Sequence, residues 1–162
     1  MPRVPFTQLP DHARTWVFGA SDPILGERAS TLLAHVDEYL DEWKAHDEPL
    51  TCARDWRDDR FLVIGVDESA AGASGCSVDA LFRILQQLQE SLGATIVGGG
   101  RVYYRDHDGA TRCTTRPEFA RLRTNGVISD DTTVLDTSVI TAADYRRRFE
   151  RTLAQSWHSA IT

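Results

Sequence analysis

The sequence predicts a single α+β domain over residues 1–162, in which about four helices pack on a mainly antiparallel sheet. Strands that form hairpins alternate with amphipathic helices, and this order favours antiparallel over parallel strands. A length of 162 residues matches one domain and is sufficient to bury a core without a disulfide or a metal. No stretch rich in proline, glycine or serine divides the chain.

The first predicted elements are a short buried strand and an amphipathic helix. The apolar segment Trp16-Val17-Phe18 indicates the strand. The helix is predicted from apolar residues spaced by three or four positions, with acidic residues on the opposite face. These apolar residues are Leu32, Leu33, Val36, Leu40 and Trp43.

A β-hairpin is expected after this helix. Residues 50–57 and 61–66 form its strands, and Arg57-Asp58-Asp59 forms the turn between them. The second strand is continuously apolar, which is typical of a central strand that is covered on both faces. We therefore expect this strand to lie in the middle of the sheet.

The strongest helix signal follows Gly72-Ala73-Ser74-Gly75, which breaks the chain. Gly93 stands where a C-terminal cap belongs. The apolar stripe of this helix consists of Val78, Leu81, Phe82, Leu85, Leu88 and Leu92.

A second hairpin and a short helix are predicted next. Asp108-Gly109 is a strong turn signal between strands at 102–105 and 111–115. Thr115-Arg116-Pro117-Glu118 has the spacing of a capping box, and the helix should end near Asn125-Gly126.

The C-terminal part is predicted as a strand and a final helix. The strand covers residues 133–135, and Thr141-Ala142-Ala143-Asp144 repeats the capping spacing before the helix. We expect this helix to be buried through four residues spaced by four: Tyr145, Phe149, Leu153 and Trp157.

Composition excludes several kinds of protein. Lys44 is the only lysine among 18 basic residues, and no glycine precedes it closely, which rules out a P-loop nucleotidase. No apolar run has the length of a membrane span, so no membrane association is expected. The first residues lack the apolar region of a signal peptide, so we expect a cytoplasmic protein. Its three cysteines are then expected as free thiols.

The charge is distributed unevenly along the chain. The formal net charge is −6, and the arginines gather in the second half, for example at 101–123 and 146–151. A basic face can attract phosphates, but a solvated arginine surface that balances the acidic first half explains these runs more simply. Nucleic acid is therefore an unlikely partner, and no cofactor is expected.

The loop that joins the apolar strand to the strongest helix is the candidate site. Free backbone N–H groups and the helix dipole at Gly75 would favour an anion. Small residues here can equally serve a tight turn or a helix cap. Asp67 and Asp79, with Glu68, could alternatively bind a hard cation such as Mg²⁺, but no fixed spacing supports that reading. The candidate ligand-binding residues are Asp67, Ser74, Gly75, Ser77 and Asp79.

Cys76 is the candidate nucleophile or redox thiol. A helix N-terminus stabilises the thiolate and should lower the pKa of Cys76. A general base would also be needed, and His46 and His158 are the candidates. The structural alternative is that Cys76 is a small buried apolar residue.

Four short motifs resemble a family of small bacterial proteins. These motifs are Trp43-x-x-His46-x-x-x-Leu50, Arg60-Phe61, Gly75-Cys76-Ser77-x-Asp79 and Ser156-Trp157-His158, in this order along the chain. Members of the family often carry the automatic label "ABC transporter ATPase". The resemblance implies a shared fold, and no established activity comes with it. The label does not fit this sequence, which has neither a Walker lysine nor the Leu-Ser-Gly-Gly-Gln signature.

Three functions are compatible with these patterns. The preferred one is binding of a small anionic ligand or a protein partner at the Gly75-Cys76 helix start. The second is a cysteine-dependent enzyme, either a hydrolase or transferase or a thiol redox enzyme, that uses Cys76. The third is a structural or regulatory homodimer with exposed aromatic contacts such as Trp56.

Overall fold

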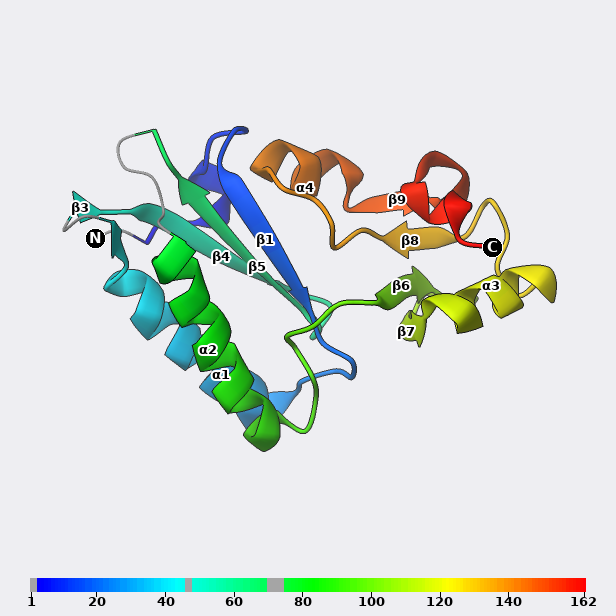
Figure 1. Cartoon of the computed structure of the whole chain (residues 1–162), viewed down its shortest axis with the longest axis horizontal. Helices are drawn as coiled ribbons and strands as arrows, with labels where there is room; N and C mark the ends of the chain where they lie inside the picture. The colour runs from blue at the N-terminus through cyan, green and yellow to red at the C-terminus, as the bar shows by residue number, and fades with distance from the viewer. Residues whose placement is uncertain (1–2, 46–47, 70–74) are drawn as a thin grey trace.

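The computed structural model describes residues 3–45, 48–69 and 75–162, with side chains except at 44, 45, 48, 49 and 75–77 (Figure 1). The described chain has the predicted α+β fold, with its main strands in two antiparallel sheets. Its elements are β1 Arg14–Gly19, α1 Gly26–Asp41, β2 Lys44–Ala45, β3 Glu48–Pro49, β4 Thr51–Arg57, β5 Phe61–Asp67, α2 Gly75–Leu92, β6 Arg101–Arg105, β7 Thr111–Thr115, α3 Arg116–Thr124, β8 Thr133–Leu135, α4 Ala142–Arg148 and β9 Glu150–Thr152. Short 3-10 helices cover Phe6–Gln8, Leu153–Gln155 and Trp157–Ala160.

The first sheet has the strand order β1-β5-β4. Its central strand is β5, the continuous apolar run, as the sequence predicts. The turn between β4 and β5 is centred on Asp58 and Asp59, which have φ values of 57° and 56°, as in a type I′ turn. Aspartate tolerates this left-handed conformation better than most residues. The turn therefore lies one residue later than predicted.

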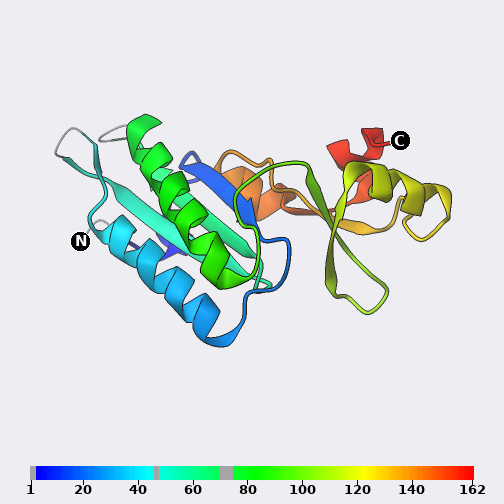
Figure 2. The same ribbon diagram turned by 60° about the horizontal axis from the view of Figure 1, so that its bottom comes forward.

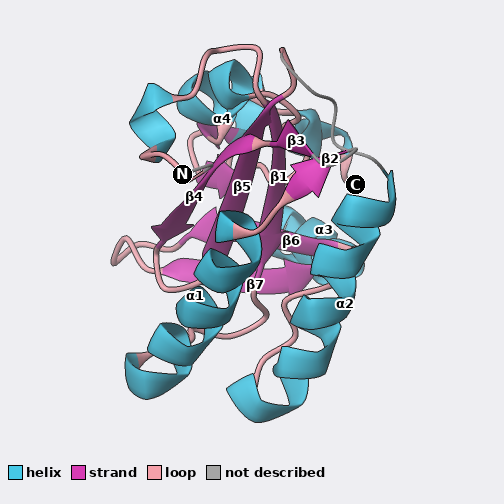
Figure 3. Cartoon of the chain, turned by 90° about the vertical axis from the view of Figure 1, so that its left-hand side faces the viewer, coloured by secondary structure: helices cyan, strands magenta, loops and turns pink. Residues whose placement is uncertain are grey.

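Helices α1 and α2 cover one face of the first sheet (Figure 3). Leu62, Ile64 and Val66 of β5 point into this layer, where they join the predicted apolar stripes of both helices in one buried cluster. Gly93 follows α2 with a φ of 67°, the conformation of the predicted C-terminal cap. Periodicity alone was sufficient to predict this layer, since each helix turns a single apolar face to the sheet.

The second sheet has the strand order β7-β6-β8-β9. The β6–β7 hairpin turns at Asp108-Gly109, as predicted, with Gly109 at a φ of 79°. The Thr115 side chain accepts a hydrogen bond from the backbone N–H of Glu118, which confirms Thr115 as the N-cap of α3, while the Glu118 carboxylate pairs with Arg121. The main strands thus form two sheets where the sequence predicted one, and β2 and β3 form a small separate sheet.

The C-terminal prediction of one long helix is wrong. Helix α4 ends at Arg148, and β9 pairs with β8, for example Leu135 with Glu150. Phe149 and Leu153 are buried as expected, but in two different clusters. Trp157 is 43% exposed. Spacing by four residues resembled a helix, but pairing with β8 extends the backbone after Phe149.

The two sheets share a buried cluster. Phe61 and Val63, on the face of β5 away from α1 and α2, pack against Tyr103 of β6 and Tyr145 and Phe149 of the α4 region. The Phe61 ring meets those of Tyr103 and Phe149 edge-on, with centroids 4.9 and 5.1 Å apart. Strand β5 is thus covered on both faces because the second sheet and α4 supply the other layer.

Two further observations concern the outer surface. Trp56, expected as an exposed contact of a homodimer, is half-buried and packs against the cluster under α1 and α2. None of the described helices is both long and apolar enough to cross a membrane.

Candidate functional site

The central residues of the sequence-predicted site lie outside the described part of the structure. Helix α2 begins at Gly75, as expected. Ser74 and His46 are not among the described residues, and the side chains of Cys76 and Ser77 are not described either. The anion site and the nucleophile at this helix start therefore remain predictions.

The two described carboxylates of the predicted site are occupied or exposed. Asp67, at the end of β5, accepts hydrogen bonds from the backbone N–H and the hydroxyl of Ser69. These bonds hold the pKa of Asp67 below its usual range. His12 Nε2 lies 3.5 Å from the same carboxylate. Asp79 is an exposed residue in the first turns of α2.

His158, one of the two candidate bases, belongs to the second sheet's side of the molecule. It is 2% exposed, and its Nδ1 is 2.6 Å from the hydroxyl of Ser156. Burial lowers its pKa, so the imidazole is neutral at neutral pH. The 3-10 helix 157–160 and the start of α2 lie toward opposite ends of the molecule in two views (Figures 1 and 2). The structure does not bring His158 to Cys76.

The other two cysteines are not acidic thiols. Cys52 is fully buried, donates to the Leu40 carbonyl at 3.4 Å, and has its pKa raised to about 12 by burial. Burial also raises the pKa of Cys113. No group of three metal-binding side chains occurs among the described residues.

Sequence reasoning missed a cleft beside strand β1. It has a volume of about 460 Å³ and lies between β1, the segment 96–101 and the segment 137–140. Its walls include the aromatic residues Trp16, Phe18, Phe82 and Tyr103. Arg14 and Arg101 are its only charged lining residues within the described chain. Its only sequence signal was the apolar strand 16–18, because the other walls come from distant segments.

The backbone groups on the free edge of β1 are hydrogen-bonded to other segments at both ends of the cleft and are unpaired between these ends. The N–H of Thr15 donates to the Ile140 carbonyl at 2.9 Å, and that of Ser21 donates to the Thr95 carbonyl at 2.8 Å. Since backbone groups alternate along a strand, Val17 and Gly19 also point away from β5. The Gly19 carbonyl accepts from Arg101. Among the described residues, no hydrogen bond on this edge reaches Val17 or the Gly19 N–H.

Two arginines that have no carboxylate partner among the described residues lie around the chain at the end of β1. The guanidinium of Arg101 donates to the Gly19 carbonyl at 2.9 Å and to the Tyr103 hydroxyl at 3.0 Å. Arg60, only 8% exposed, donates to the Ala20 and Ser21 carbonyls. Neither arginine forms an ion pair with a described residue. Of these two arginines, only Arg101 lines the cleft, so it alone brings positive charge to this end of the cleft.

The opposite end of the cleft is less cationic. Arg14 lies over the Trp16 ring, 4.9 Å from its centroid, and is 3.9 Å from a carboxylate oxygen of Glu68. Glu68 offsets part of this charge, so an anionic group is best accommodated near Arg101.

Comparison of the chain with protein-family models, with curated proteins and with solved structures found no match. The resemblance to the small bacterial family therefore remains a prediction.

Proposed function

We propose that this protein binds an anionic ligand with an apolar body in the cleft beside β1. The observation that carries the proposal is the cleft itself: aromatic walls, with Arg101 at one end and no acidic residue among its described lining. Pockets of this kind are mostly apolar, with a few polar groups that orient the ligand. The ligand class agrees with the one expected from the sequence, but its place differs from the Gly75-Cys76 helix start.

The charge of Arg101 is available to a ligand because carbonyl and hydroxyl groups, rather than a carboxylate, hold it in place. These bonds fix the guanidinium without neutralising it. Burial raises the pKa of Tyr103 to about 12, so this partner stays a neutral phenol at neutral pH. Hydrogen bonds between a charged guanidinium and an anion are stronger than bonds between neutral groups.

The test uses two fluorescent probes that differ only in charge. Anilinonaphthalene sulfonate carries an anionic group on an aromatic body, and phenylnaphthylamine is its neutral relative. We expect the sulfonate to bind with one site per chain, and Arg101→Gln to weaken its binding about tenfold by removing a charge-assisted hydrogen bond.

The matched control is Arg112→Gln, which removes an exposed arginine of β7 that pairs with Asp106 outside the cleft. It should change the affinity for the sulfonate less than about twofold, because exposed charges outside the site are screened by salt. Phenylnaphthylamine should not distinguish the two variants. Equal sensitivity of the sulfonate to both substitutions would overturn the proposal.

A further inference from the structure

We propose that the ligand of the cleft is an extended peptide segment that adds a strand to the open edge of β1, with an acidic side chain at Arg101. This inference rests on the proposed function and names the class of ligand. Strand addition to a sheet edge obtains affinity from main-chain hydrogen bonds and specificity from pockets for alternate side chains.

The open edge offers the groups that strand addition requires. Between Thr15 and Ser21, whose N–H groups are already bonded to other segments, the N–H and carbonyl of Val17 and the N–H of Gly19 face the cleft. Unpaired strand edges of this kind pair readily with another chain. A ligand without a peptide backbone leaves these alternating donors and acceptors unmatched.

The length of the open edge limits the size of the segment. Six residue steps separate Thr15 from Ser21, which at about 3.3 Å per residue is roughly 20 Å. Because both ends are closed by the Ile140 and Thr95 carbonyls, about three to five residues of an incoming strand can pair between them. The cleft therefore accommodates a short extended segment rather than a long strand.

The side-chain environment on the two faces of the edge is apolar. Trp16 and Phe18 point toward the α1–α2 layer, and Phe82 of α2 meets Phe18 with ring centroids 5.2 Å apart. Val17 points toward the other face, where it packs with the cluster that both sheets share. Since side chains of a strand alternate between faces, an incoming segment places apolar residues in both layers.

Charge complementarity favours an acidic partner over a second copy of this chain. In an antiparallel pair of β1 strands centred on Val17, Arg14 of one copy would lie opposite Ala20 of the other, next to the Gly19 carbonyl that Arg101 binds. Like charges placed opposite each other destabilise strand pairing. A segment with Asp or Glu at that position instead gains an ion pair with Arg101.

The experiment follows the backbone amides of Val17 and Gly19 by NMR in the full-length protein. The probe is a pentapeptide Val-Thr-Val-Glu-Val, blocked at both ends, and its counterpart has Lys in place of Glu. We expect the acidic peptide to shift both amide signals and to slow their hydrogen exchange. The Lys peptide should bind about tenfold more weakly, and this difference should disappear in Arg101→Gln.

Two further peptides test the strand geometry without changing the protein. One carries N-methyl groups on its second and fourth residues, the other on its third and fifth. Backbone N–H groups alternate between the two edges of a strand, so each peptide is blocked along a different edge. Only one edge of the peptide can face β1, so one peptide should lose at least tenfold in affinity and the other should change less than about twofold. Equal effects of the two patterns would overturn strand addition.

The outcomes separate the inference from the proposed function. Arg101-dependent binding of the sulfonate probe together with unchanged Val17 and Gly19 amides in the presence of peptide overturns the inference alone. Loss of Arg101 dependence for both the sulfonate and the peptide overturns both. Binding of two protein copies through β1, seen as a concentration-dependent mass that Arg101→Gln increases, also overturns the inference.

Discussion

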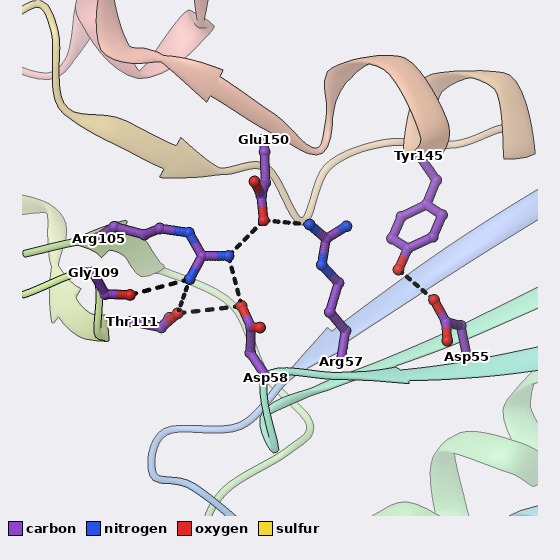
Figure 4. Close-up of polar contacts among 8 residues, drawn as sticks. All are labelled: Asp55, Arg57, Asp58, Arg105, Gly109, Thr111, Tyr145 and Glu150. Atoms are coloured by element: carbon purple, nitrogen blue, oxygen red, sulfur yellow. Dashed lines mark hydrogen bonds and ion pairs between the residues drawn. The ribbon is translucent and has the colours of Figure 1, made fainter.

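The first and second sheets meet at two places, and the arginines at these places have different kinds of partner. Near the β4–β5 turn, Arg57 and Arg105 share the carboxylate of Glu150, and Arg105 also bonds Asp58 at 3.0 Å (Figure 4). We call these four residues the ion-pair junction. At the cleft, Arg101 bonds only carbonyl and hydroxyl groups among the described residues, and the buried Arg60 nearby at the end of β1 bonds only carbonyls.

The kind of partner distinguishes arginines that stabilise the fold from an arginine that is available to a ligand. In the ion-pair junction each arginine has a carboxylate partner, and the Arg57 guanidinium also lies 4.9 Å from the centroid of the Phe149 ring. Its cations are neutralised and hold the sheets together. At the cleft the charge of Arg101 is held in position but not neutralised, as a site for an anion requires.

Tyr103, which lies between the two places, should give the largest effect on stability. Burial raises its pKa from 10.0 to about 12, against a smaller lowering by the Arg101 hydrogen bond. The unfolded chain ionises this phenol first, so its contribution is complete below pH 10 and is lost as the pH rises toward 12. For Tyr103 alone this loss amounts to about 2–3 kcal/mol. Cys52 and Tyr145, whose pKa values burial also raises, add to it, and denaturant unfolding at a series of pH values measures the sum.

Tyr103→Phe should reduce the alkaline loss of stability by the share of Tyr103, about 2–3 kcal/mol. Tyr104→Phe is the matched control on the same strand, where the phenol is only half-buried, and it should leave most of the loss in place. If the two variants reduce the alkaline loss of stability equally, Tyr103 is not the group responsible for its share of that loss. Its neutral state then no longer supports the geometry around Arg101.

The ion-pair junction should contribute more to stability than the cleft arginine does. Glu150→Gln leaves Arg57 and Arg105 without their shared charge, and we expect a loss of about 1–2 kcal/mol because these groups are only partly exposed. Arg101→Gln should cost less than about 0.5 kcal/mol, since the glutamine amide, at the place of Arg101 Nε, can still donate to the Tyr103 hydroxyl. Urea unfolding of both variants measures the difference.

Glu118→Gln, which removes an exposed ion pair, is the reference variant for Glu150→Gln and Arg101→Gln. Glu118 pairs with Arg121 three residues later on α3, and such exposed pairs contribute little. A cost of Glu150→Gln no greater than that of Glu118→Gln would contradict a structural role for the ion-pair junction. A large cost of Arg101→Gln would make that arginine structural as well.

The smallest expected effect concerns Cys76. Its reactivity tests whether the cleft is the only anion site. The alkylation rate is measured against pH, with and without phosphate, and Cys76→Ser assigns the signal. Because Cys52 and Cys113 have raised pKa values, they should not react near neutral pH. If Cys76 is an acidic thiol at a helix start, its apparent pKa lies below about 8.5 and phosphate protects it.

An ordinary or slow reaction of Cys76 would exclude the nucleophile and leave the cleft as the candidate site. Protection by phosphate would instead establish a second anion site at the start of α2. That result would weaken the contrast between paired and free arginines as a guide to function in this protein.

Local signals in the sequence were sufficient for the elements that depend on neighbouring residues. The apolar stripes of α1 and α2, the Asp108-Gly109 turn and the Thr115 cap were all predicted correctly. Each depends on interactions within a few residues of the chain, so periodicity and turn chemistry reveal it. The apolar run of β5 likewise indicated a central strand.

Only the tertiary structure decided the features that join distant segments. Strand β9 forms because β8 offers it a partner, and this pairing overrides the helical spacing after Phe149. The cleft exists because the carbonyls of Ile140 and Thr95 close the two ends of the β1 edge and leave Val17 between them. No local pattern encodes such contacts, because their energies depend on residues far apart in the chain that folding brings together.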